Sequence, residues 1–301
     1  MGRSGSTLLC RLLGQANGVC SVGELCYVWD QGVLNNRTCG CGLPFADCPF
    51  WNEVGATSFG GWHQVDAARA LALRRSVERT RFVPALATGC ATQAFKERHR
   101  EYAGLMAQVY RGIRDVSGCD VVLDASKYPS SAYLAFRNPE VDLRLLHLVR
   151  TSPGVAYSWS KVVARPDRDG KPLARFSPTR SAVDWNVYNA LVEGLRPLGA
   201  AYRRLRYEDF VAAPAAVIED VLDFLEVPRS TLDFVHGQDV ELHQTHTVAG
   251  NPMRFRQGAE KVRRDDEWSS EMEPRVRRIV TGLTLPALLR YGYGADGTYR
   301  A

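Results

Sequence analysis

The chain begins with a run of glycine, hydroxyl and cationic residues directly before an apolar stretch. In MGRSGSTLLCRLLG, Arg3 stands between two glycines, with serine and threonine around it. Glycine lets a backbone approach a ligand closely, and a turn that enters a helix leaves N–H groups that attract anions. The pattern favours a phosphate-binding loop in which Arg3 supplies a permanent charge. A turn that merely caps a helix is the alternative. The loop is not of the NTPase type, because no lysine precedes Thr7.

A second anion-binding pair is predicted near the middle of the chain. The apolar run Leu143–Val149 is typical of a buried strand, and Arg150 follows it directly. Ser158 comes eight residues later, on a helix predicted over residues 153–163. Ligands of open α/β sheets bind at the carboxyl ends of the strands, so Arg150 and Ser158 can meet on one phosphate. A surface arginine beside an ordinary helical serine is the alternative.

Several segments of the chain together resemble one enzyme family. GRSGSTLL, VRTSPGVAYSWS and LRYEDF look like the 5′-phosphosulfate loop, the 3′-phosphate site and the Y-E-D segment of sulfotransferases. These enzymes use 3′-phosphoadenosine 5′-phosphosulfate (PAPS) and release PAP. HTVAGNPMRFRQG and RYGYG extend the resemblance over nearly the whole chain, closest to the bacterial and the carbohydrate or tyrosylprotein branches. The resemblance implies an α/β, P-loop-like three-layer fold with a central, mostly parallel sheet.

The resemblance also assigns donor-binding roles. Arg3 would hold the 5′-phosphosulfate and stabilise charge on the leaving oxygen. Arg150 and Ser158 would bind the 3′-phosphate, and Tyr207 would lie near the adenine. In the late segment RFRQG, Gln257 replaces the lysine of the family's R-K-G. The loop and the late segments add the remaining expected donor-binding residues: Ser4, Gly5, Ser6, Thr7, Leu8, Arg254, Arg256 and Gly258.

Two further residues are expected to carry the chemistry. Glu24, in SVGELC, resembles the general base of tyrosylprotein sulfotransferases, and Lys127, in DASKYPSSAYL, matches the family's D-x-S-K. Asp124 is expected to orient Lys127 or Ser126. In the implied in-line attack, Glu24 accepts the proton of the acceptor hydroxyl, while Arg3 and Lys127 stabilise developing charge. Fixed cations can replace Mg²⁺, so no metal is expected. A solvated surface glutamate and an exposed lysine at a helix start are the alternatives.

The elements that must position these residues follow from the rest of the sequence. The chain has 301 residues, of which 45% are hydrophobic and 24% charged, and no linker divides it. We therefore expect one domain over residues 1–301, with a partly irregular, helical acceptor-side lobe inserted at residues 32–117. Apolar runs predict strands at Asp120–Asp124 and Tyr202–Tyr207 besides Leu143–Val149, whereas only a short apolar turn is expected just before Glu24. His147, inside a strand, is expected to be structural.

The beginning of the chain differs from the family pattern. In the family an apolar strand runs into the phosphate loop, but here Met1 directly precedes Gly2. We therefore expect a truncated or misassigned start.

Composition limits the partners. The net charge is only +5 and no block of like charges occurs, which argues against nucleic acid. No apolar stretch approaches a membrane span and no signal peptide is visible, so a cytoplasmic enzyme is expected. The preference for arginine over lysine suggests a bacterial genome. The acceptor is expected to be a small molecule or carbohydrate with a free hydroxyl, and the oligomeric state stays open. A P-loop kinase and a non-catalytic PAP-binding protein are the competing functions.

Three cysteines cluster in CGCGLPFADCPFW, at Cys39, Cys41 and Cys48. A Gly-rich loop of packed, reduced thiols is the reading that the sequence favours. A zinc site with Cys26 or His63 as the fourth ligand and a disulfide are the alternatives.

Overall fold

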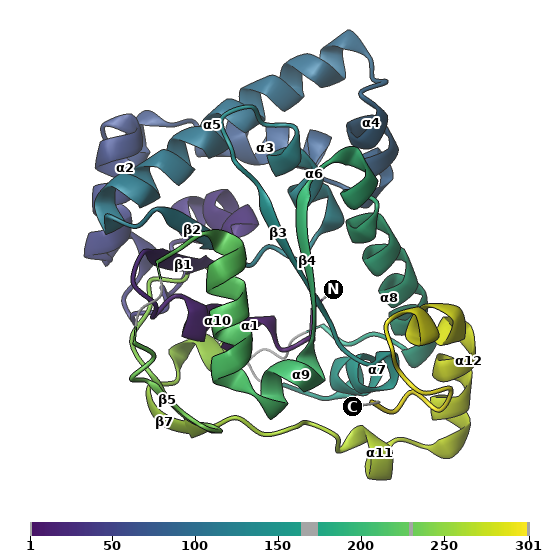
Figure 1. Cartoon of the computed structure of the whole chain (residues 1–301). Helices are drawn as coiled ribbons and strands as arrows, with labels where there is room; N and C mark the ends of the chain where they lie inside the picture. Colours follow the sequence, from purple (N-terminus) through teal and green to yellow (C-terminus); the bar gives the residue numbers. More distant parts are fainter. Residues whose placement is uncertain (1, 164–173, 229–230, 300–301) are drawn as a thin grey trace.

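The computed structural model describes residues 2–163, 174–228 and 231–299, so Met1 lies outside the described part. Helices surround short sheets in an α/β arrangement (Figure 1). The described strands form two parallel pairs and one antiparallel sheet of three strands. Within these ranges, no helix has both the length and the apolar run that crossing a membrane would require.

The first parallel pair joins strands far apart in the sequence. Helix α1 (Ser6–Leu13) leads to β1 (Val19–Gly23), which pairs with β2 (Val121–Asp124), so that Val19 lies opposite Val121 and Gly23 opposite Asp124. The prediction of a strand at β2 is confirmed. The expectation of a turn before Glu24 is wrong, because VCSVG forms β1. The run VCSVG has only five residues, which is too short to show a period, and pairing with β2 makes it a strand.

The second parallel pair, β3 (Arg144–Val149) and β4 (Ala201–Arg206), is in continuous register. Both strands were predicted from their apolar or alternating runs. Helix α7 (Ser152–Ser160) follows β3 directly and packs against α8 (Pro178–Glu193), which precedes β4. Figure 1 shows β3 and β4 side by side at the centre of the molecule, with α8 along one flank.

The expected single central sheet is divided between these pairs. Among the described strands β2 pairs only with β1, and β3 only with β4. A cavity of about 700 Å³ is lined by both β2 and β3 and by Leu9, Cys10 and Leu13 of α1. Among the described strands none pairs with β2 or β3 on the side of this cavity, so each of the two is an edge strand there.

A helical lobe follows β1 and returns the chain to β2. Its core is aromatic: Trp29, Phe45 and Trp51 are fully or almost fully buried, and the rings of Phe45 and Trp51 stack with centroids 5.1 Å apart. The long helix of this lobe begins where the Thr92 side chain accepts a hydrogen bond from the Phe95 amide, a regular N-cap. The lobe helices are α2 (Pro49–Phe59), α3 (Ala67–Val77), α4 (Val83–Thr88) and α5 (Gln93–Ser117), with a π-helical segment at Val28–Leu34. Helix α6 (Pro129–Phe136) follows β2 and contacts α4.

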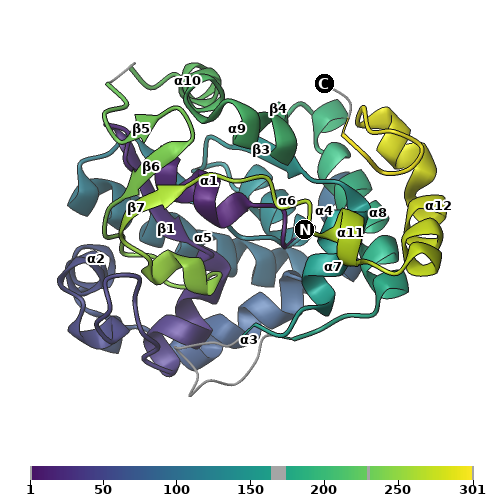
Figure 2. The ribbon, with the colours of Figure 1, turned by 90° about the horizontal axis from the view of Figure 1, so that it is seen from below.

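The C-terminal third contacts the residues that directly follow β3: Asp265 accepts a hydrogen bond from Arg150, and Gly297 accepts one from Thr151. Figure 2 shows the antiparallel sheet on one side of α1, whereas α11 and α12 lie beside α7 and α8. The Y-E-D segment joins β4 to the chain end: the buried Glu208 accepts hydrogen bonds from the Thr151 amide (3.3 Å) and the Tyr293 hydroxyl (2.7 Å). The elements of this third are α9 (Tyr207–Ala212), α10 (Pro214–Leu225), β5 (Val235–His236), β6 (Asp239–Leu242), β7 (Gly258–Lys261), α11 (Trp268–Glu271) and α12 (Pro274–Arg290).

Candidate functional site

Glu24 and Lys127 meet at the carboxyl ends of the first parallel pair. Glu24 follows β1 directly, and Lys127 comes three residues after the end of β2. The Lys127 Nζ donates a hydrogen bond to the Glu24 Oε1 and forms an ion pair with it. Their side chains are 15% and 20% exposed, so solvent reaches the pair but does not surround it. A carboxylate and an ammonium group are thus held together where α/β sheets bind ligands.

The carboxylate of Asp124 fixes both turns that carry this pair. Its Oδ1 accepts hydrogen bonds from the Leu25 amide (3.1 Å), the Ser126 amide (2.8 Å) and the Ser126 hydroxyl (2.6 Å). The Tyr110 hydroxyl donates to Oδ2 at 2.8 Å. One partly buried carboxylate therefore binds the residue after Glu24 and the residue before Lys127. Burial raises the pKa of Asp124, whereas these four hydrogen bonds act to lower it.

The glycine loop has the strained backbone of a close turn. Arg3 has φ 70° and Gly5, which caps α1, has φ 86°. A Cβ atom on Gly5 would lie 2.5 Å from the ring of Tyr207, so only glycine fits there. A Cβ atom on Gly2 would lie 3.6 Å from the Lys127 side chain and 3.0 Å from Trp159. The loop thus passes beside Lys127.

The Arg3 side chain faces both an aromatic ring and the carboxylate. Its guanidinium lies 5.1 Å from the centre of the Trp159 ring, a cation–π distance. Burial lowers the pKa of Arg3, while the nearby negative charge of Glu24 raises it. The charge of Arg3 therefore acts on the same region as the Glu24–Lys127 pair.

Arg150 lies at the carboxyl end of β3, as predicted, and touches the loop. Its side chain is buried, Nη1 donates to the Arg3 carbonyl (3.3 Å), and the guanidinium lies 4.7 Å from the centre of the Tyr207 ring. Its Nη2 also donates to the Asp265 carbonyl (2.6 Å) and pairs with the Asp265 carboxylate (3.0 Å). The structure thus brings Arg3, Arg150 and Tyr207 together. Sequence reasoning missed Asp265, because nothing in RRDDE indicates a partner 115 residues away.

The other predicted donor-binding residues are more scattered. Ser158 is partly buried on α7, next to Trp159. The buried Arg254 donates to the carbonyls of Thr247 (2.6 Å) and Thr38 (2.7 Å).

The segment RFRQG contains the last two predicted donor-binding residues, Arg256 and Gly258. The Arg256 side chain is 62% exposed and pairs with Glu260. Gly258, with φ 84°, opens β7. A Cβ atom on Gly250 would lie 3.9 Å from the Glu24 Oε1 and 3.7 Å from the Arg254 side chain, so the chain just before this segment borders the carboxylate.

His147 is structural, as expected from its place in a strand. Its ring lies between the Tyr202 hydroxyl (2.6 Å) and the Asn189 side-chain oxygen (2.9 Å). Burial lowers the pKa of His147 to about 4, so the ring is neutral near pH 7. The His147 ring thus supports the second strand pair, whereas the Glu24 carboxylate lies beside the cations Lys127 and Arg3.

Comparison of the fold identifies similar solved structures. The sulfotransferase domain from the curacin biosynthetic pathway is similar with a TM-score of 0.50 and 16% identity, over 95% of this chain and 94% of that one. The sulfotransferase domain from the Synechococcus PCC 7002 olefin synthase is similar with a TM-score of 0.51 and 19% identity, over 97% and 92%. No family model and no curated protein matches the sequence. The chain therefore shares its fold with sulfotransferase domains.

Proposed function

We propose that the chain is a PAPS-dependent sulfotransferase that transfers a sulfuryl group to a hydroxyl of a small molecule or carbohydrate. The contact between Glu24 and Lys127 carries the proposal, because it sets a proton acceptor beside a cation at adjoining strand ends, next to a glycine loop. The fold shared with two sulfotransferase domains supports the same function.

The donor site of this proposal has two ends. The loop Arg3–Leu8 binds the 5′-phosphosulfate, Arg150 and Ser158 bind the 3′-phosphate, and Tyr207 borders the adenine. The Arg150 Nε is buried without a partner among the described residues, which suits an added anion. Contacts support Arg3, Arg150 and Tyr207, whereas Arg254, Arg256 and Gly258 are proposed from the resemblance alone. Since Arg3 and Lys127 supply the cations, no metal is part of the proposal.

The proposed reaction is an in-line displacement at sulfur. The Glu24 carboxylate accepts the proton of the acceptor hydroxyl as its oxygen bonds to sulfur. The bond from sulfur to the bridging phosphate oxygen breaks, and Arg3 and Lys127 stabilise the charge left on that oxygen. PAP and the sulfate ester are the products. Lys127 turns from Glu24 towards the donor when PAPS binds, which frees the carboxylate to act as a base.

A single substitution separates catalysis from binding. Glu24→Gln keeps the size of the side chain but removes its basicity, so it should retain PAP binding and lose sulfuryl transfer from radiolabelled PAPS to an acceptor panel. Glu53→Gln, on an exposed turn of α2, is the matched control and should keep both. Unchanged transfer by Glu24→Gln would contradict the assigned base. If ATP with Mg²⁺ raised the thermal unfolding temperature of the native chain and PAP did not, the result would instead indicate a phosphotransferase.

A further inference from the structure

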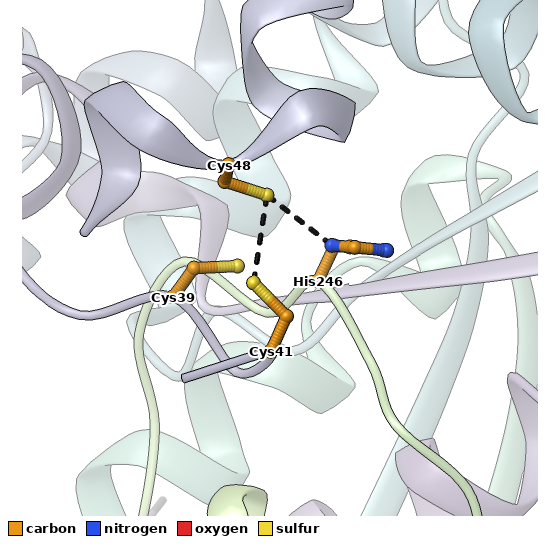
Figure 3. A group of neighbouring side chains, drawn as sticks. All are labelled: Cys39, Cys41, Cys48 and His246. Atoms are coloured by element: carbon orange, nitrogen blue, oxygen red, sulfur yellow. Dashed lines mark hydrogen bonds between the residues drawn. The ribbon is translucent and has the colours of Figure 1, made fainter. Parts of the chain in front are cut away.

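Outside the proposed active site, four side chains with metal-binding atoms converge. The sulfur atoms of Cys39, Cys41 and Cys48 and a ring nitrogen of His246 all lie within 4.8 Å of one another. Figure 3 shows the four side chains pointing towards one another. Cys39 and Cys41 lie on the turn after the π-helical segment, and Cys48 caps α2. His246 comes from the C-terminal third, 198 residues after Cys48.

The spacing of these atoms fits a tetrahedral zinc ion. Zn–S bonds are about 2.3 Å long, so two sulfur ligands at a tetrahedral angle lie about 3.8 Å apart. The sulfur atoms of Cys41 and Cys48 are 3.7 Å apart. The Cys48 sulfur lies 3.2 Å from the His246 Nδ1, which is slightly closer than two ligands of one zinc ion and leaves a small adjustment on binding.

The chemistry of the donors selects the metal. Three thiolates and one imidazole favour zinc over Mg²⁺ or Ca²⁺, which prefer oxygen ligands. Four protein ligands complete the tetrahedron, so the site is structural in type and leaves no position for a substrate. Cys39 and Cys48 are buried, and Cys41 and His246 are partly buried, which limits exchange with solvent.

Contacts of the surrounding chain orient the four side chains. The Gly40 amide donates to the Thr247 carbonyl (2.9 Å), and the Trp51 indole donates to the His246 carbonyl (2.9 Å). The His246 ring stacks on Phe50, with ring centres 5.0 Å apart. A Cβ atom on Gly40 would lie 2.4 Å from the Thr247 hydroxyl, so glycine lets the two segments approach closely.

We propose that Cys39, Cys41, Cys48 and His246 bind one structural zinc ion that joins the lobe to the segment after β6. This segment continues to Ala249, whose carbonyl accepts a hydrogen bond from the Glu24 amide (3.1 Å). The zinc ion therefore also fixes the backbone beside Glu24. The site does not depend on the proposed reaction.

In this cluster His246 stands in place of Cys26 or His63, the two fourth ligands that the sequence offered for the zinc alternative. Neither Cys26 nor His63 belongs to the cluster, and the exposed ring of His63 forms a hydrogen bond with the Gln64 side chain. All eight cysteines lie within the described ranges and are free thiols. The structure therefore contains no disulfide among Cys39, Cys41 and Cys48.

Metal analysis of the purified full chain tests the proposal. After purification without chelator, elemental analysis should give one zinc ion per chain. A thiol-reactive mercurial should release this zinc, and a chelating dye should detect it. His246→Ala and Cys48→Ser should retain less than half of the zinc, and Cys90→Ser, at an exposed cysteine, should retain all of it. His246→Cys, which restores four ligands, should keep zinc and thereby separates lost ligation from misfolding.

Cobalt gives a second reading on the unaltered chain. Co²⁺ added to zinc-free protein should produce thiolate-to-metal charge-transfer bands and the d–d bands of tetrahedral cobalt, and one equivalent of Zn²⁺ should remove them. Zinc-free preparations that alkylate at all eight cysteines and give no cobalt spectrum would overturn the proposal. A disulfide among Cys39, Cys41 and Cys48 in the freshly purified chain, detected by mass after alkylation, would overturn it as well.

Discussion

The Asp124 carboxylate accepts a hydrogen bond from the Leu25 amide across the parallel strands β1 and β2. The same oxygen binds the Ser126 amide and hydroxyl, so the turn that carries Glu24 and the turn that carries Lys127 have a common anchor. The geometry of the ion pair therefore depends on a residue that does not belong to it.

Asp124→Asn should lower sulfuryl transfer at least tenfold with little change in PAP affinity. An amide oxygen is a weaker acceptor, and the amide NH₂ would face the Tyr110 hydroxyl or the backbone amides. We expect a loss of about 1–3 kcal/mol in the free energy of unfolding. Steady-state kinetics and calorimetry measure both effects. Asp115→Asn, on the exposed end of α5, is the control and should behave as the native chain. A proportional loss of PAP binding and turnover would show that Asp124 supports the fold rather than the pair.

Asp265→Asn should strengthen PAP binding. The Asp265 carboxylate pairs with Arg150 at 3.0 Å and competes with any incoming phosphate. Because this carboxylate is 39% exposed, its removal is worth about 1 kcal/mol at most, which corresponds to roughly a fivefold lower Kd. Calorimetric titration with PAP measures the change, and Asp266→Asn serves as the neighbouring exposed control. Weaker binding in Asp265→Asn would mean that the carboxylate orients Arg150 for the phosphate.

Gly5→Ala should destabilise the chain by about 1–3 kcal/mol and abolish PAP binding, because alanine is strained at φ 86° and its Cβ would meet Tyr207. Urea denaturation and PAP titration measure these effects. The matched change is Gly282→Ala, in open space on the exposed side of α12, which should stabilise by about 0.5–1 kcal/mol. If the Gly5→Ala protein bound PAP as tightly as the native chain, the glycine loop would not be part of the donor site.

His147 should make the native chain sensitive to acid. Its folded pKa of about 4 lies below the ordinary value of 6.5, so the unfolded chain binds the proton more readily. The stability that neutral His147 provides is complete above pH 6.5 and is lost as the pH falls towards 4, by about 3 kcal/mol. Urea denaturation at several pH values should show this loss, and His147→Gln should lack it. Equal pH dependence in both proteins would contradict the lowered pKa.

The sequence predicted the parts of this site that depend on local pattern. Arg150 was placed correctly because an apolar run bounded by polar residues marks β3. Lys127 was placed correctly for the same reason, after β2. The short strand β1 was missed, since its five residues become a strand only by pairing with a segment about 100 residues later.

Residues recruited over long distances were also missed. Asp265 and His246 reach their partners from the C-terminal third, and no periodicity or spacing connects them with Arg150 or Cys48. The missing strand before the glycine loop was noted from the sequence, but which strands pair with each other depends on tertiary contacts rather than on local propensity.

The proposed donor site requires that Arg150 and the glycine loop bind the two phosphates of one adenosine nucleotide. Calorimetric titration of the native chain with PAP and with adenosine 5′-monophosphate, which lacks only the 3′-phosphate, tests this directly. We predict that PAP binds at least tenfold more tightly, and that Arg150→Gln removes the difference. Equal affinity of the native chain for the two nucleotides, or no binding of PAP, would contradict the account.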